Sequence, residues 1–285
     1  MGRRGLPIAI AGAVAAAGVA LAAFAAPSLP RFADKSPNAI PVDVELVIAV
    51  DVSYSMDPEE QALQREGYVT ALTSREFLRA LHEGPNGKIA VTYFEWAGQN
   101  DQKIVMPWRL IDGPEAADAV AAEIARAPYR RASRTSISGG LRFAKPLFDT
   151  SGYRGLRRVI DVSGDGANND GALVTPTRDD VLAAGITING LPIMLKRPNP
   201  GTMDIEELDI YYEDCVIGGP GAFVVPIRER AKFIEATRTK LVLEIAGRQP
   251  EPRVLPASAE APRISCTIGE QRWQDRWGGG GYDFR

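Results

Sequence analysis

The sequence is poor in the side chains that most often carry catalysis. Its 285 residues include one histidine, His82, and two cysteines, Cys215 and Cys266. One histidine cannot help to build a zinc site of the usual cysteine and histidine type, and no Cys-x-x-Cys pair occurs. The Gly-x-Ser-x-Gly and His-Glu-x-x-His motifs of common hydrolases are also missing. We therefore expect no catalytic residues and no enzymatic turnover, and we assign His82 a surface or helix-capping role.

Clusters of positive charge are missing as well. The 33 Lys and Arg residues are scattered and are outnumbered by 36 Asp and Glu, for a net charge of −3. This excludes the basic stripe that is typical of nucleic-acid binding. The glycine-containing segments 164–166 and 218–221 lack the spacing of a phosphate-binding loop and are interpreted as turns.

The N-terminus predicts export. Arg3 and Arg4 precede an uncharged, Ala-rich stretch over residues 6–26, which is typical of a secretory signal peptide. Ala23-Phe-Ala25 matches the small-x-small cleavage pattern. The alternative is an uncleaved membrane anchor, because about 20 apolar residues can span a bilayer. Either alternative places the rest of the chain in the periplasm or outside the cell, with a membrane partner only if the segment is uncleaved.

The remaining chain divides by composition into a linker, a domain and a tail. Residues 27–42 form a Pro- and Ser-containing linker, 43–246 a folded domain, and 247–285 a Pro- and Gly-rich tail that we expect to be largely irregular. An exported chain with two cysteines favours a bridge between Cys215 and Cys266, although two buried thiols remain an alternative.

Strand-like and helix-like segments alternate along the domain. Apolar runs predict strands at 44–50, 88–95, 103–110, 156–163, 185–193 and 221–226. Helices are expected at 57–82, 114–127, 136–148, 177–184, 204–215 and 227–246. The first should begin with Asp57 as its N-cap, followed by Pro58 and the acids Glu59 and Glu60. The pattern predicts an α/β fold, a doubly wound and mostly parallel sheet of six strands with helices on both faces. Pro107 places the third strand at an edge.

Three oxygen-bearing side chains follow the first of these strands. In extended chain, residues two apart point the same way, so Asp51, Ser53 and Ser55 can face one point. Oxygen ligands of this kind suit a hard cation such as Mg²⁺. Further ligands are expected at other strand ends. Thr135 precedes a helix, with Ser133, Ser136 and Ser138 as its rivals. Asp165 follows the fourth strand and is preferred to Asp161, which lies inside that strand.

These residues resemble the von Willebrand factor A (vWA) domain and its metal-ion-dependent adhesion site (MIDAS). That family has Asp-x-Ser-x-Ser after the first strand, a Thr in a second loop and an Asp in a third, here Asp51, Ser53, Ser55, Thr135 and Asp165. The segments "VDVELVIAVDVSYSMDPEEQ" and "CVIGGPGAFVV" look close to an uncharacterised bacterial family of exported vWA-like proteins. The resemblance covers residues 44–246. It implies a three-layer, Rossmann-like fold with an antiparallel edge strand, and direct coordination by the three hydroxyls.

The expected function is adhesion through a cation. A cation held by neutral hydroxyls stays electrophilic, so Mg²⁺, or Mn²⁺ or Ca²⁺ in its place, can accept a Glu or Asp carboxylate from a protein partner. Glu95, Trp96, Asn168 and Asn169 are candidates for the ligand rim, the alternative being ordinary loop polarity and a core Trp. A metal-dependent periplasmic hydrolase and a metal-independent scaffold are the competing hypotheses.

Overall fold

The computed structural model describes residues 2, 37–196, 203–247 and 261–277 of the chain. The expected signal peptide or anchor and most of the linker therefore lie outside the described residues. Within the described part, no helix combines the length and the apolar character that crossing a membrane requires.

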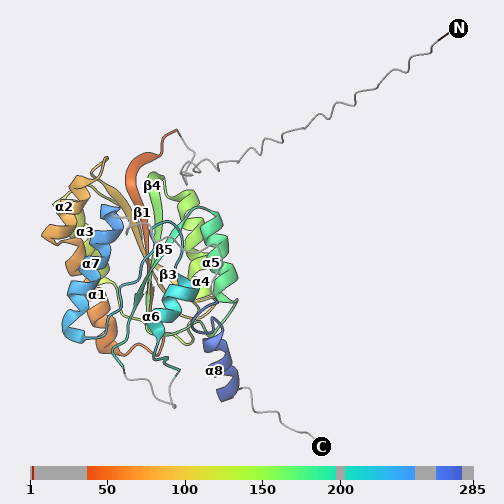
Figure 1. Cartoon of the computed structure of the whole chain (residues 1–285). Coiled ribbons are helices and arrows are strands. Elements are labelled where there is room, and N and C mark those ends of the chain that lie inside the picture. Colours follow the sequence, from red (N-terminus) through yellow and green to blue (C-terminus); the bar gives the residue numbers. More distant parts are fainter. Residues whose placement is uncertain (1, 3–36, 197–202, 248–260, 278–285) are drawn as a thin grey trace, which may run out of the picture.

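Strands and helices alternate through most of the chain (Figure 1). The elements are β1 (Ile40–Asp51), α1 (Pro58–Leu72), α2 (Arg75–Glu83), β2 (Ile89–Trp96), β3 (Gln102–Ile111), α3 (Pro114–Arg126), α4 (Ile137–Ala144), η1 (Lys145–Thr150), β4 (Tyr153–Gly164), α5 (Val174–Ala183), β5 (Thr187–Pro192), α6 (Leu208–Tyr211), η2 (Tyr212–Val216), η3 (Arg230–Lys232), α7 (Phe233–Ala246) and α8 (Ile268–Trp277). This order confirms the predicted α/β class.

The central sheet has the strand order β3-β2-β1-β4-β5. β1 pairs in parallel with β2 and β4, and β5 pairs in parallel with β4, whereas β3 is antiparallel to β2. The antiparallel edge strand that contains Pro107 is therefore confirmed. After β1 the chain builds β2 and β3 on one side and then returns to place β4 on the other. This change of direction puts the topological switch point, where open α/β sheets bind ligands, between β1 and β4.

The predicted count of six strands is wrong for the described residues, in which the sheet has five. The expected sixth strand lies beside β5 but makes only isolated bridges, Gly190 with Val224 and Ile193 with Ile227. Gly218 adds a third bridge to Ile188. Separate bridges do not form a continuous ladder, so this segment lines the edge of the sheet without extending it.

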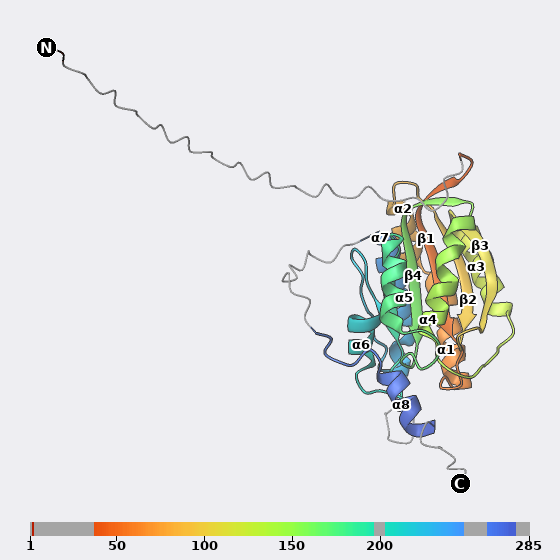
Figure 2. The same cartoon turned by 90° about the vertical axis from the view of Figure 1, so that its right-hand side faces the viewer.

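Alternate residues of each strand face opposite helical layers. On β1, Leu46 and Ile48 pack into one buried cluster with side chains of α1, α2, α3 and α7. Val47 and Ala49 pack into another with side chains of α4, α5 and α6. Figures 1 and 2 show the two helical layers on either side of the sheet. Because β1 is covered on both faces, its apolar residues do not alternate with polar ones.

Local signals explain where the helices begin. Asp57 and Glu60 form a capping box at the start of α1, next to Pro58, which confirms the predicted cap. The single helix expected over 57–82 is instead two helices. Ser74 accepts a hydrogen bond from the Phe77 amide and so begins α2 two residues after α1 ends.

Candidate metal centre

Asp51 ends β1 in a tight turn that is closed by its own side chain. Its Oδ1 accepts a hydrogen bond from the Ser53 amide at 2.7 Å, and the Met56 amide donates to the Ser53 carbonyl at 3.1 Å. Asp51 and Ser53 are both fully buried. The turn presents the Asp51 carboxylate and the following hydroxyls at the carboxyl end of the sheet, as the spacing of two predicts.

A chain of hydrogen bonds joins this turn to the end of β4. The Ser53 and Ser55 hydroxyls lie 2.7 Å apart, and the Ser55 hydroxyl donates to Asp165 Oδ1 at 2.6 Å. The structure therefore brings Asp165 to the Asp-x-Ser-x-Ser turn across 110 residues of sequence. Asp161, its rival, lies inside β4 and is paired with Lys240 at 2.5 Å.

Thr135 reaches the same point from a second loop. The Ala132 amide donates to the Val52 carbonyl at 3.0 Å, which holds this loop against the Asp51 turn. A Cβ placed on Gly166 would lie 3.6 Å from Thr135 Oγ1, so the hydroxyl faces the turn that follows Asp165.

The three serines that competed with Thr135 have other positions. Ser136 caps α4, with its hydroxyl accepting from the Gly139 amide at 3.1 Å and donating to the Asp170 carbonyl at 2.7 Å. The Ser138 hydroxyl lies inside the molecule, 3.3 Å from that of Ser136. Ser133 is exposed. Thr135 is therefore the hydroxyl of this loop that faces the Asp165 turn.

The carboxylates at this point are incompletely satisfied. Asp51 Oδ2 is buried and has no hydrogen-bond partner among the described residues, and the same holds for the hydroxyl of Tyr212. Both atoms border Gly164, where a Cβ would lie 2.8 Å from Asp51 Oδ2 and 3.1 Å from Tyr212 Oη. Burial, and then the charge of Asp165, raises the pKa of Asp51 to about 8. Burial also raises the pKa of Asp165, although Lys196 opposes the shift.

Such an arrangement fits a hard divalent cation. It combines a buried carboxylate oxygen that lacks a partner, three hydroxyls and a second carboxylate, and hard cations prefer oxygen ligands of this kind. A cation would offset the repulsion between two buried acids, which otherwise favours protonation. The residues that would hold it are Asp51, Ser53, Ser55, Thr135 and Asp165.

A lysine that sequence reasoning missed borders this group. Lys196 Nζ lies 3.0 Å from Asp165 Oδ2 and 2.6 Å from Glu60 Oε2, and it also donates to the Ser55 carbonyl. The Lys196 side chain is one-third exposed. Glu60 was predictable as part of the start of α1. No local pattern in the sequence marks Lys196, which lies 31 residues beyond Asp165.

Glu95 and Trp96 do not belong to a ligand rim. Glu95 is 1% exposed and pairs with Arg65 at 2.8 Å and with Arg130 at 3.0 Å. Trp96 is fully buried and packs against Gly140. The prediction failed because a strand end can be covered by neighbouring elements, here by arginines from α1 and from the loop after α3.

Asn168 and Asn169 connect the loops that carry Asp165 and Thr135. Asn169 Oδ1 accepts from the Thr135 amide at 3.0 Å, and the Asn169 amide donates to the Thr135 carbonyl at 2.8 Å. Asn168 is fully buried, and its Oδ1 accepts from the Ser138 amide at 3.0 Å. Both asparagines therefore use their amide groups to hold the site together.

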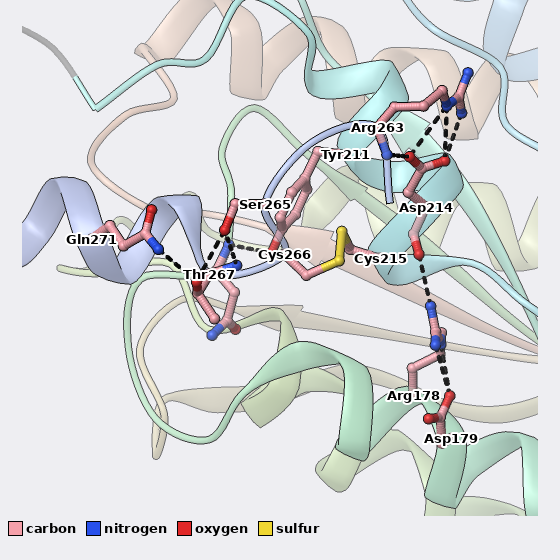
Figure 3. Close-up of a disulfide and its surroundings, with 11 residues drawn as sticks. Arg178, Asp179, Tyr211, Asp214, Cys215, Arg263, Ser265, Cys266, Thr267 and Gln271 are labelled. Atoms are coloured by element: carbon pink, nitrogen blue, oxygen red, sulfur yellow. Dashed lines mark hydrogen bonds and ion pairs between the residues drawn. A yellow bond between two sulfur atoms is a disulfide. The ribbon is translucent and has the colours of Figure 1, made fainter. Parts of the chain in front are cut away.

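The C-terminal segment is more ordered than expected. Cys215 and Cys266 form a disulfide, with their Cα atoms 5.4 Å apart, which answers the open question of their pairing (Figure 3). Residues 268–277, expected to be irregular, form α8. Figures 1 and 2 both place α8 beyond the strand ends, at the same end of the sheet as α6. The rest of the predicted tail lies outside the described residues.

Known proteins of solved structure share this fold. The family model described as "Protein of unknown function (DUF1194)" matches residues 41–249, and no curated protein matches the chain. Proximal thread matrix protein 1 from the mussel byssus has a TM-score of 0.54 at 14% identity, over 73% of this chain and 49% of its own. Another structure of that protein, described as having a zinc-occupied MIDAS motif, gives 0.53 at 17%, over 73% and 48%.

A bacterial adhesin is similar as well. The pilus adhesin SpaC from Lactobacillus rhamnosus GG has a TM-score of 0.52 at 15% identity, over 75% of this chain and 31% of its own. The chain thus spans about half the length of the mussel protein and about a third of the adhesin. At these identities the likeness shows the fold alone, and that fold is the vWA fold that the sequence resemblance implied.

Proposed function

Because the chain belongs to the family described as "Protein of unknown function (DUF1194)", which brings no activity with it, we propose a function from the site itself. The chain is an exported vWA protein that binds a divalent cation, Mg²⁺ or else Mn²⁺ or Ca²⁺. Through this cation it binds a Glu or Asp side chain of a protein partner, without enzymatic turnover. The residues that hold the cation are Asp51, Ser53, Ser55, Thr135 and Asp165.

The observation that carries the proposal is that Asp51 Oδ2 is buried without a hydrogen-bond partner among the described residues, in the turn that also carries the Ser53 and Ser55 hydroxyls. Asp51 and Asp165 contribute −2, Glu60 and Lys196 cancel, and a divalent cation contributes +2, so the sum is zero. Neutral hydroxyl ligands withdraw little charge from the cation, which therefore keeps its attraction for a further carboxylate. That property suits docking of an acidic partner.

The surroundings of the site also favour an acidic partner. Arg131 and Arg134 lie on the Thr135 loop and form no ion pair within the described residues. Arg131 donates to the Tyr54 carbonyl at 2.6 Å, between Ser53 and Ser55 in the chain. Tyr54 itself is 61% exposed. The solvent-facing side of the site thus offers two guanidinium groups and an aromatic ring, all of which are common in protein interfaces.

Cation binding is tested first by thermal unfolding of the purified chain. A cation that binds only the folded state adds about 2.7 kcal/mol at 100 times its Kd, or roughly 5–10 °C in a domain of this size. We expect this rise with Mg²⁺ or Mn²⁺ in the wild type, and none with Asp51→Ala. Asp118→Ala removes an exposed acid of α3 and should keep the rise. A wild-type chain without any cation response contradicts the proposal.

Partner binding is tested separately by capture from the envelope of the producing cell. We expect partners that are retained in Mg²⁺, released by EDTA and not retained by Asp51→Ala. Capture that is unaffected by EDTA would instead favour the second candidate, a metal-independent scaffold. One observation supports that candidate, because Lys196 already forms ion pairs with Asp165 and Glu60 without a cation.

A further inference from the structure

The segment 261–277 contacts both loops that carry the proposed cation ligands. A Cβ on Gly269 would lie 2.0 Å from the Asn168 carbonyl oxygen, so α8 and the loop after Asp165 touch backbone to backbone. Glu270 Oε1 accepts a hydrogen bond from Asn168 Nδ2 at 2.7 Å. The Trp273 ring lies under Arg134, with the guanidinium carbon 3.2 Å from the ring centroid. Arg134 directly precedes Thr135 in the other loop.

A second segment, residues 208–216, holds the same region from another side. The Tyr211 hydroxyl accepts a hydrogen bond from the Asn168 amide at 3.2 Å, and the Tyr212 hydroxyl borders Gly164 and Asp51. The Cys215–Cys266 disulfide joins this segment to 261–277 (Figure 3). Figure 3 also shows Arg263 bound to Asp214 beside the disulfide, through contacts of 2.6–3.2 Å. We call these two segments, 208–216 and 261–277, the C-terminal clasp.

We propose that the C-terminal clasp sets the geometry of the cation site, with Glu270 and Trp273 as its positioning residues; this inference rests on the proposed function. Glu270 acts through Asn168, which lies three residues after Asp165 and also binds the Ser138 amide of α4. Groups that orient ligands from outside the coordination shell commonly set metal affinity. Neither residue touches the cation ligands directly.

Arg134 shows why Trp273 matters to Thr135. It is the one residue other than glycine with a positive φ, 74°, among the described residues. This left-handed conformation is unfavourable for an arginine and persists where the surroundings hold it. Stacking of the guanidinium on Trp273 supplies such a hold, and the next residue is the ligand Thr135. Loss of the ring therefore frees the backbone that aims the Thr135 hydroxyl.

The experiment compares two alanine variants with two conservative ones in the full chain. Glu270→Ala and Trp273→Ala should each weaken Mn²⁺ binding about 10-fold in calorimetry, the usual size for loss of an outer positioning group. Glu270→Gln keeps an acceptor for Asn168 and Trp273→Phe keeps a ring under Arg134, so both should restore most of the affinity. Gln274→Ala is the matched control, because Gln274 is exposed on the same helix, whereas Trp277 packs against Trp273 with ring centroids 5.8 Å apart.

A second readout needs no cation. In the metal-free chain, amide hydrogen exchange at Asn168 and Asn169 should become faster in both alanine variants and stay unchanged in Gln274→Ala. Reduction of the disulfide in the wild type should shift both readouts in the same direction, which covers the case of a variant that fails to fold. If α8 only stabilised the fold, the alanine variants would lower the melting temperature but would leave the Mn²⁺ affinity of the folded chain unchanged.

Unchanged affinity together with unchanged exchange would overturn the inference, as would equal effects in Gln274→Ala. If the wild type binds no cation, the proposed function fails, whereas exchange at Asn168 and Asn169 still decides whether the clasp positions the loops. Failure of one proposal is thus distinguishable from failure of the other.

Discussion

Two groups of buried acids lie along β4, and they are neutralised in different ways. The interior acid cluster consists of Asp161, Lys240 and Glu244. The strand-end acid cluster consists of Asp51, Asp165, Glu60 and Lys196. Asp161 and Asp165 are four residues apart in sequence, yet the first lies within the strand and the second just beyond its end.

The interior acid cluster carries its own cation. Lys240 Nζ lies 2.5 Å from both Asp161 and Glu244, and none of the three side chains is exposed. Tyr68 donates to Asp161 at 3.1 Å, and Asn189 donates to Glu244 at 3.3 Å. A lysine of α7 thus compensates charges that ions in the solvent cannot reach.

The strand-end acid cluster is left incomplete on one side. Lys196 forms ion pairs with Asp165 and Glu60 and is partly exposed, but Asp51 Oδ2 has no hydrogen-bond partner in the described residues. Both clusters sit in the same sheet, and in each cluster one lysine faces more than one acid, so the distinguishing feature is exposure. No side chain of the interior acid cluster is exposed, whereas Lys196 at the strand end is one-third exposed.

Lys240→Met should have the largest effect, because it leaves two buried acids without their cation. Breaking a buried pair in this way costs about 3–5 kcal/mol. We expect a loss of that size in urea unfolding at neutral pH, with or without Mg²⁺. Lys232→Met, a change to an exposed lysine near the start of α7, should leave the urea midpoint almost unchanged. Equal midpoints for both variants would show that the interior acid cluster is not stabilising.

Asp51→Asn and Asp161→Asn should have opposite effects on two measurements. Without a cation, the raised pKa of Asp51, about 8, keeps its carboxyl group mostly protonated at neutral pH, so Asp51→Asn should leave the stability of the metal-free chain unchanged. The variant should lose the cation-dependent gain of about 2.7 kcal/mol at 100 times the Kd for Mg²⁺. Asp161→Asn removes one partner of Lys240 and should cost about 1–3 kcal/mol of metal-free stability while it retains the gain. Thermal unfolding with and without Mg²⁺ separates them, and matching profiles would contradict the comparison.

Lys196→Gln should strengthen cation binding, because it removes a positive charge beside Asp165. We expect Mg²⁺ affinity to rise about 3- to 10-fold, or ~0.6–1.4 kcal/mol. Calorimetry at low ionic strength measures the change, since salt screens the partly exposed charge. Lys145→Gln removes the same charge from an exposed pair with Asp180 and serves as the control. A weaker affinity in Lys196→Gln would mean that Lys196 helps to build the site.

The smallest effect concerns pH and the interior acid cluster. Burial, and then Asp161, raises the pKa of Glu244 from 4.5 to about 7. Between these values the folded chain binds a proton that the unfolded chain releases, so Glu244 makes stability fall as pH rises. One proton bound only by the folded chain corresponds to about 1.4 kcal/mol per pH unit, and because Glu244 is partly titrated in this range we expect a slope of about 1 kcal/mol per pH unit or less. Urea unfolding from pH 5 to 7 should show a flatter profile for Glu244→Gln, and an unchanged slope would refute this.

Local patterns predicted the elements whose environment is uniform. β1 and β4 are covered on both faces, so their apolar runs stand out in the sequence. The same reasoning failed at 221–226, where an apolar run lines β5 through separate bridges. It also missed the break between α1 and α2, because the apolar pattern continues across Ser74 and only the cap reveals a new helix.

The residues of the candidate site also divide into those that local patterns predict and those that they do not. Asp51, Ser53 and Ser55 were predictable because their spacing of two repeats the geometry of a strand. Lys196 and Tyr212 were not, because each arrives from a distant segment that carries no motif. Sequence patterns report what one segment does, whereas charge compensation depends on which segments meet.

The edges of the sheet determine how a partner can approach. β3 carries Pro107, which lacks an amide donor, and its register with β2 shifts next to this residue. The other edge is occupied by the bridges from Gly218, Val224 and Ile227 to β5. Pro107 interrupts the row of donors at one edge and the bridges occupy part of the other, which hinders strand addition by a second chain. Recognition of a partner by backbone pairing is thereby disfavoured. Selectivity for a partner then depends on the side chains and the cation at the strand ends.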